Sequence, residues 1–231
     1  LPAGSIPGMV WGAVAGILLA VLENLVPKRA KPWVPSPTSL GLAFVILGLI
    51  AWYVFRLGRS EAELLAARRS KDDKLFSLST GLMHFAFLQI LLGALVAGID
   101  AGRSFPDWPL MAGGFFPPDP FQIEPLWRNF FENAGTVQFM HRMAGYLLFA
   151  FGVVVWLRGH KSANAATRFA FNAVMAAMVV QVTLGIVTVI YQAQWHVAIT
   201  HQFVAVVLWV AILRARFLSL YPKAQSVRSP A

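Results

Sequence analysis

Three of the five histidines in this 231-residue chain lie inside long apolar stretches, where an ionisable side chain is costly and suggests a function. Two of them, His141 and His201, lie four to five residues after the start of their stretches. If these stretches are helices, both imidazoles sit about 6–7 Å below the edge. Because a neutral imidazole is a common axial ligand of heme iron, two imidazoles at matched depth predict a pair of axial heme ligands.

Small residues accompany both histidines at a spacing that places them on the same helical face. Gly145 follows His141 by four residues, and Ala205 follows His201 by four residues. Small side chains at these positions would leave room for a flat macrocycle between two helices. The alternative is that both histidines are hydrogen-bonded structural residues and that their matched depth is a coincidence.

The other ionisable residues fit this site less well. His84 lies deeper in its stretch, which favours a structural role or one supporting the ligands. Arg142 could extend to lipid headgroups or pair with a carboxylate such as a heme propionate. Glu23 could be catalytic, but its surroundings favour an interfacial position. His160 and His196 fall in connections and are expected to contact solvent.

The composition excludes an ordinary soluble enzyme. Hydrophobic residues make up 58% of the chain and charged residues 13%, about half the charged share of an average soluble domain. The net charge of +9 comes without a basic cluster among aromatic residues, so a nucleic-acid partner is not expected. The absence of cysteine excludes disulfides and thiolate metal ligands within this chain. These features predict an integral membrane protein whose partner is lipid.

Six segments are long and apolar enough to span a membrane as helices, which predicts an all-α, polytopic helical bundle. They are residues 9–26, 39–57, 75–99, 137–157, 168–191 and 197–217. Alternate connections and the tail carry 13 Lys and Arg residues, against five on the opposite side. The excess of positive charge places both termini and the 56–74 connection on the cytoplasmic side, and the long 100–136 connection outside.

The 100–136 connection is unusually aromatic for an aqueous loop. Such side chains would be costly in water unless they lie on the membrane surface or cover a site. Both explanations, an interfacial belt and a lid over a bound group, remain open from the sequence. The residues concerned are Phe105, Trp108, Phe115, Phe116, Phe121, Trp127, Phe130 and Phe131.

A set of motifs between residues 75 and 217, about 60% of the chain, resembles the second half of the heme A synthase family. The motifs occur in the family's order and include LLGALVAGIDAG (91–102), WPLM (108–111), FPP (116–118), RNFFENAGTVQFMHR (128–142), QVTLGIVTV (181–189) and ITHQ (199–202). The resemblance implies a protein of eight helices in two repeated four-helix bundles. It also implies that the whole protein oxidises a methyl group of heme O to the formyl group of heme A, for cytochrome oxidase assembly.

The family's second bundle holds a b-type heme between two histidines, which are matched here by His141 and His201. The first bundle carries a Glu-x-x-His-Arg motif, and its counterpart in this chain runs from Gln138 to Arg142, with Gln in place of the acid. The resemblance therefore makes His141 and His201 the iron ligands. It adds Gln138 and Arg142 to Gly145 and Ala205 as the predicted cofactor-binding residues.

The first part of the chain departs from the family pattern. No Glu-x-x-His-Arg occurs in it, and PSPTSLGLAF (35–44) resembles the start of the family's fourth helix without its ligating histidine. We therefore expect the catalytic residues upstream of this chain. The predicted organisation is a remnant of the first bundle (1–74), a complete second bundle (75–217) and a cytoplasmic tail (218–231).

The resulting hypothesis is an oxidoreductase, the heme b half of a heme A synthase. The resemblance implies heme O as substrate, heme A as product, and heme O synthase, an unidentified electron acceptor and a second copy of the chain as candidate partners. It places the chain in the bacterial cytoplasmic membrane or the mitochondrial inner membrane. The alternatives are a membrane b-type cytochrome that only relays electrons, or a heme-free membrane scaffold or transporter.

Overall fold

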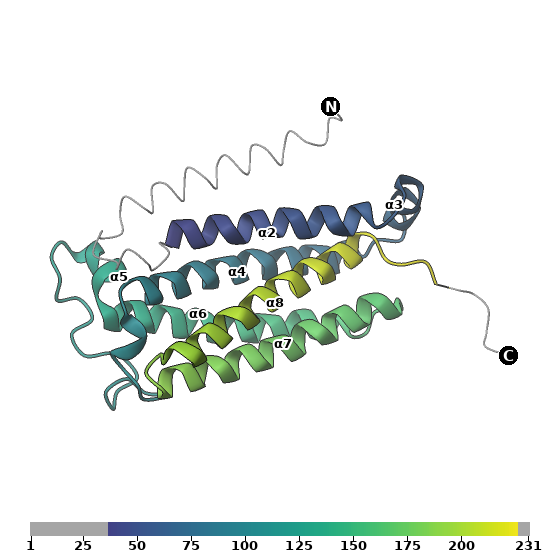
Figure 1. The fold of residues 1–231 in the computed structure, drawn as a ribbon. Coiled ribbons are helices and arrows are strands. Elements are labelled where there is room, and N and C mark those ends of the chain that lie inside the picture. Colours follow the sequence, from purple (N-terminus) through teal and green to yellow (C-terminus); the bar gives the residue numbers. More distant parts are fainter. Residues whose placement is uncertain (1–36, 226–231) are drawn as a thin grey trace.

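The computed structural model describes residues 37–225, and all regular elements in this range are helical (Figure 1). Five helices are long and two are short. They are α2 (Pro37–Leu57), α3 (Glu61–Arg68), α4 (Asp73–Gly98), α5 (Asn129–Glu132), α6 (Ala134–Gly159), α7 (Ala165–Ile190) and α8 (Trp195–Leu220). Two short 3₁₀ helices, η1 (Ala101–Arg103) and η2 (Leu126–Arg128), lie in the connection between α4 and α6.

The five long helices are each long and apolar enough to cross a membrane. They coincide with five of the six predicted spans, which confirms a polytopic helical membrane bundle. The sixth predicted span, 9–26, and Glu23 within it lie outside the described residues.

Three of the long helices begin at a polar residue that caps the first turn. In each, a side-chain oxygen accepts a hydrogen bond from a backbone N–H that would otherwise have no partner within the helix. The pairs are Asp72 with Leu75, Asn133 with Thr136 and Asn164 with Thr167, at 2.9, 3.0 and 3.1 Å. Such caps fix where each helix starts, and so fix the depth of every residue along it.

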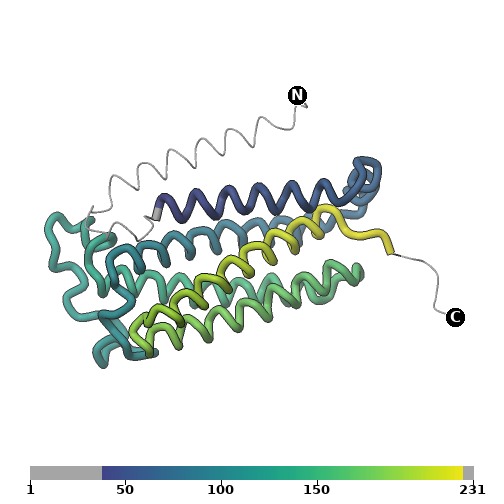
Figure 2. The backbone as a smooth tube through the Cα atoms, in the orientation of Figure 1, coloured from purple at the N-terminus to yellow at the C-terminus, as the bar shows by residue number. Residues whose placement is uncertain are grey.

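The helices α4, α6, α7 and α8 run side by side, and α2 lies along them (Figure 2). The α2 helix packs on α8, because Trp209 Nε1 donates to the Phe44 carbonyl at 3.1 Å and the Trp52 and Phe217 rings meet edge to face. The α4–α6 connection lies at one end of the bundle, while α3 and the end of α8 lie at the other (Figure 1). The connections that are predicted to face opposite sides of a membrane are therefore at opposite ends.

Candidate functional site

His141 and His201 line one cavity of about 510 Å³ at the end of the bundle that carries the long connection. His141 is the eighth residue of α6 and His201 the seventh of α8. These helices begin three and two residues earlier than the sequence predicts, so the histidines lie about 10.5 and 9 Å from the helix starts. Both are deeper than the predicted 6–7 Å, but their depths still match.

A glycine on a neighbouring helix faces each imidazole. A Cβ on Gly93 of α4 would lie 3.0 Å from His141 Cε1, and a Cβ on Gly185 of α7 would lie 3.3 Å from His201 Cε1. A glycine in a membrane helix commonly allows close helix approach. In the structure these two glycines have a more specific effect, since the missing side chain provides the space that each imidazole ring occupies.

The small residues on the histidine helices lie beside the same cavity. Gly145 and Ala205 both line it. A Cβ on Gly145 would lie 3.2 Å from Gln89 Nε2, so the space left by this glycine is filled largely by an amide rather than being open.

Two glutamines that are not among the predicted site residues contact the imidazoles. Gln89 Nε2 on α4 lies 3.1 Å from His141 Nδ1 and 3.4 Å from His141 Nε2, and it donates to the His141 carbonyl at 3.0 Å. Gln181 Nε2 on α7 lies 3.4 Å from His201 Nε2. The sequence does contain one indication of their position: each glutamine precedes a glycine of the site by four residues, which places both on the same helical face.

Arg142 and Gln138 hold the long connection over the cavity. Arg142 donates to the Leu110 carbonyl at 3.0 Å and to the Phe105 carbonyl at 2.8 Å, and Gln138 Nε2 donates to the Phe105 carbonyl at 3.1 Å. Arg142 is only 7% exposed, which does not fit an extension to lipid headgroups, the first of its two alternatives. Its guanidinium is buried and binds backbone carbonyls of the connection instead.

The aromatic residues of the connection divide between the two explanations left open above. Trp108 lines the cavity, and its Nε1 donates to the Tyr146 hydroxyl at 2.7 Å. Trp108 is itself 42% exposed, but the others that are exposed do not line the cavity, namely Phe115, Phe116, Phe121, Trp127 and Phe130. A covering role therefore belongs to Trp108, whereas the other exposed rings fit an interfacial belt.

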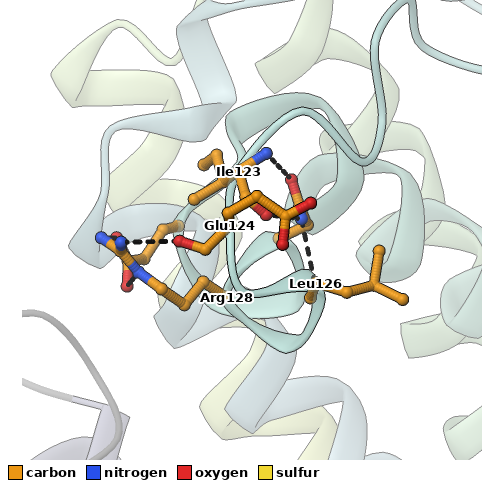
Figure 3. A network of polar contacts seen from close by, with 6 residues as sticks. Ile123, Glu124, Leu126 and Arg128 are labelled. Atoms are coloured by element: carbon orange, nitrogen blue, oxygen red, sulfur yellow. Dashed lines mark hydrogen bonds and ion pairs between the residues drawn. The ribbon is translucent and has the colours of Figure 1, made fainter.

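The connection has its own internal frame, which includes Ile123, Leu126 and Arg128 (Figure 3). The fully buried Asn129 lies at its centre. Its Nδ2 donates to the Ile123 and Leu126 carbonyls at 2.6 and 2.9 Å, and its Oδ1 accepts from the Ile123 N–H at 2.9 Å. Arg128 pairs with Glu132, and this hydrogen bond raises the pKa of Arg128. The polar residues of RNFFEN thus build the connection and do not reach the histidines.

Asp107 fixes a turn of the same connection next to Trp108. Its carboxylate accepts a hydrogen bond from the Gly113 N–H at 3.2 Å. Partial burial acts to raise the pKa of Asp107, but hydrogen bonds from the backbone N–H groups of Gly113 and Ala112 outweigh it and leave this pKa below its ordinary value.

Polar atoms without partners gather at the cavity. Among the described residues, six buried side-chain N or O atoms have no hydrogen-bond partner, and five belong to residues that line this cavity. They are Gln89 Oε1, Gln138 Oε1, Arg142 Nε, Gln181 Oε1 and His201 Nδ1. Such atoms are rare in folded proteins, so their concentration here suggests a site for a polar or metal-containing group.

The donor set fits heme better than a bare cation. Within residues 37–225, no group of three or more His, Cys, Asp or Glu side chains could hold a metal ion. Two imidazoles are enough for heme iron, because the macrocycle supplies the remaining ligands. The mostly apolar cavity wall also suits a flat apolar ring system.

The remaining histidines lie apart from this cavity. His84 is exposed on α4 and does not line it, so it supports neither imidazole. His160 ends α6, where it stacks on Trp156 at 4.7 Å between ring centroids. His196 is exposed in the first turn of α8, as expected for a residue in contact with solvent.

Comparison with known proteins finds relatives over most of the chain. A family model described as cytochrome oxidase assembly protein matches residues 11–213. The chain is 70% identical over 191 residues to heme A synthase of Ruegeria sp. (strain TM1040), covering 83% of this chain and 50% of that protein. It is 65% identical to heme A synthase of Ruegeria pomeroyi over 224 residues, covering 96% and 58%. The chain thus spans about half the length of these relatives, and no solved structure matches it.

Proposed function

Because the chain belongs to the cytochrome oxidase assembly protein family, we propose that it is the heme-ligating half of a heme A synthase. Its relatives named heme A synthase are about twice as long as the part that aligns. In this proposal residues 75–217 form the second of two bundles, residues 1–74 are a remnant of the first, and the catalytic residues lie outside this chain.

The observation that carries the proposal is the symmetric environment of His141 and His201. Each imidazole lines the same cavity, at matched depth, opposite a glycine whose missing side chain makes room for it. A structural histidine needs a hydrogen-bond partner but needs neither a shared cavity nor a second imidazole. We therefore infer that His141 and His201 would hold a b-type heme through its iron.

The other cavity residues would position this group and keep water from it. A bis-histidine heme supplies one-electron transfer when bound. Trp108 covers the cavity, and Arg142 and Gln138 hold the backbone beside Trp108 in place. The small side chain of Ala205 would leave room for the group on α8, whereas the space beside Gly145 on α6 is filled largely by the Gln89 amide. Exclusion of water and the apolar surround would set the potential of the site.

For the whole protein, we propose the oxidation of a methyl group of heme O to the formyl group of heme A. The named bacterial relatives support the bacterial cytoplasmic membrane as its location. The distribution of Lys and Arg supports an outward-facing α4–α6 connection, with both termini of this chain in the cytoplasm. Heme O synthase, an electron acceptor and a second copy of the chain are the proposed partners besides lipid.

The first test is the absorption spectrum of the detergent-purified chain, oxidised and dithionite-reduced, followed by pyridine extraction. We expect the spectrum of a six-coordinate b-type heme at about one heme per chain, as two axial imidazoles require. A folded but colourless chain would overturn the assignment. Formation of heme A when the longer protein is co-expressed with a source of heme O would separate a synthase from a cytochrome that only relays electrons.

The ligand assignment is tested by His141→Ala and His201→Ala, with His84→Ala as the matched control. All three changes remove an imidazole from a membrane helix, but only the first two remove one from the cavity. We expect loss of the six-coordinate spectrum in the first two and a wild-type spectrum in the control. Unchanged spectra in both cavity variants would contradict the proposal.

A further inference from the structure

Two arginines lie together where the ends of α2 and α8 meet, at the end of the bundle opposite the cavity (Figure 1). Arg59 follows α2 by two residues and donates from Nη1 to the Tyr221 carbonyl, directly after α8, at 2.8 Å. Arg214 lies on α8, and its guanidinium covers the Phe55 ring of α2 at 4.9 Å and the Phe217 ring at 5.6 Å. The Phe217 and Tyr221 rings are 5.1 Å apart between centroids, so both arginines belong to one corner of the bundle.

The protein does not balance the positive charge of this corner. Among residues 37–225, Arg214 makes no hydrogen bond or ion pair, and the charged group that acts on it is a second cation, Arg59. Glu63 does attract Arg59, but its carboxylate caps α3, where it accepts from the Ser60 N–H at 2.7 Å and from the Ser60 hydroxyl at 2.9 Å. Cation–π contacts stabilise a guanidinium without neutralising it. The pair therefore favours an anion from outside the described chain.

Both guanidiniums also keep unused hydrogen-bond donors. A guanidinium carries five N–H donors in a planar fork that matches the oxygens of a phosphate group. Arg59 uses Nη1 on the Tyr221 carbonyl, and Nη2 on the Glu63 and Pro222 carbonyls at 3.4 and 3.3 Å. Its Nε, and all five N–H groups of Arg214, donate to no acceptor in the described part of the chain. A phosphate between the two arginines would satisfy these donors.

The depth of Arg214 indicates where such a phosphate would come from. Arg214 lies six residues before the end of α8 at Leu220, about 9 Å along the helix axis. The 26 residues of α8 span about 39 Å, which exceeds the hydrocarbon core of about 30 Å. The half-buried Arg214 is therefore expected near the edge of the hydrocarbon on the predicted cytoplasmic side. Phospholipid headgroups lie at this level, and anionic ones are found in the cytoplasmic leaflet.

We propose that the corner formed by Arg59 and Arg214 binds the phosphate of an anionic phospholipid of the cytoplasmic leaflet. Arg214 donates to the phosphate oxygens through its fork, and Arg59, held on the end of α8, supplies the second positive charge. A zwitterionic phospholipid carries the same phosphate, but its ammonium group would bring a third cation to this corner. The site lies apart from the cavity, so the proposal goes beyond the proposed function and does not depend on bound heme.

The test is lipid binding to the delipidated, detergent-purified chain, measured by native mass spectrometry with phosphatidylglycerol and phosphatidylcholine as probes. We expect one phosphatidylglycerol to bind about tenfold more tightly than phosphatidylcholine, as one charge-assisted hydrogen bond can supply. Arg214→Gln should abolish most of this preference, and Arg59→Gln should lower it less, because Arg59 already binds backbone carbonyls. Arg214→Lys keeps the charge without the fork and should keep part of the preference.

Arg68→Gln is the matched control, because Arg68 is exposed on α3 at the same end of the bundle and the change removes the same charge. It should keep the wild-type preference. Equal affinity of the wild type for both lipids, an unchanged preference in Arg214→Gln, or an equal loss in Arg68→Gln would overturn the proposal.

Free phosphate is the other possible source of the anion. Inorganic phosphate that displaces phosphatidylglycerol at low concentration would identify a site for a soluble anion and overturn the lipid assignment. Melting temperatures without added lipid show whether each variant folds. If Arg214→Gln does not fold, Arg59→Gln decides by the same outcomes, and heme content has no part in the result.

Discussion

The two halves of the site hold the same side chain, an imidazole, in different settings. In the α4–α6 half, His141 is in contact with Gln89 through the ring and the backbone, and the residue after it, Arg142, is buried against the long connection. In the α7–α8 half, His201 has one side-chain contact, and the residue after it, Gln202, is exposed.

The difference follows from the connections that join the helices. Residues 99–133 form an extensive connection with a frame of its own, whereas α7 and α8 are joined by the short turn 191–194. That turn has room for a bend, through left-handed backbone at Gln192 and Ala193, but not for a cover. The repeated set of histidine, glycine and glutamine therefore shapes the cavity, while the unequal connections decide which imidazole is shielded.

The largest expected effect comes from removing the link between α6 and its connection. Arg142→Leu abolishes the two hydrogen bonds to the Leu110 and Phe105 carbonyls. Hydrogen bonds from a charged group are worth about 1.5–3 kcal/mol each, so opening of the connection should become easier by about 3 kcal/mol. Hydrogen exchange of residues 105–114 measures this.

Gln202, the residue after the other histidine, provides the control for Arg142→Leu. Gln202→Leu alters the residue after the other histidine, where no connection is held, and should leave exchange of residues 105–114 unchanged. If Arg142→Leu also leaves their protection intact, the internal frame and Gln138 hold the connection without Arg142, and the contrast between the halves is wrong.

A smaller effect is expected from adding one methyl group in each half. Gly93→Ala would bring a Cβ to 3.0 Å from His141 Cε1, and Gly185→Ala would bring one to 3.3 Å from His201 Cε1. Overpacking of this kind costs about 1–3 kcal/mol, and the tighter contact beside the more firmly held ring should cost more.

Heme content after purification and the rate of heme loss measure the two glycine variants. We expect Gly93→Ala to lose heme faster than Gly185→Ala, and both to lose it faster than the wild type. Gly81→Ala is a useful control, since its Cβ would meet the Phe151 ring at 3.3 Å, away from the cavity. Equal loss in both cavity variants would show that the two imidazoles are held alike.

Hydropathy was enough to predict five of the spans, and spacing was enough to predict that His141 and His201 lie at matched depth, because both are properties of single helices. The starts of α6 and α8 were predicted two or three residues late, since hydropathy marks the first apolar residue. The capping residue before it, such as Asn133, was the better signal for α6. The depth of His141 was underestimated for this reason.

The contacts of Gln89 and Gln181 with the two imidazoles could not be predicted in the same way. A glutamine four residues before a glycine in a membrane helix has the same pattern whether it faces lipid, another helix or a site. Only the packing of α4 against α6 and of α7 against α8 decides between these. The backbone conformation of the α4–α6 connection could not be predicted either, because left-handed backbone at residues such as Ala112 and Asp119 has no strong sequence signal.

The smallest expected effect is a difference between the two connections in how their stability changes at low pH. Hydrogen bonds from backbone N–H groups hold the pKa of Asp107 below its ordinary value of 3.8, so this carboxylate stabilises the folded turn when ionised. Its contribution is fully present above the unfolded pKa and is lost as pH falls through the lower folded pKa. Exchange protection of residues 107–113 should therefore be constant down to about pH 5 and decline below about pH 4. The 191–194 turn contains no carboxylate and should not share this decline. Asp107→Asn removes the response; if the variant keeps it, another acidic group holds the connection.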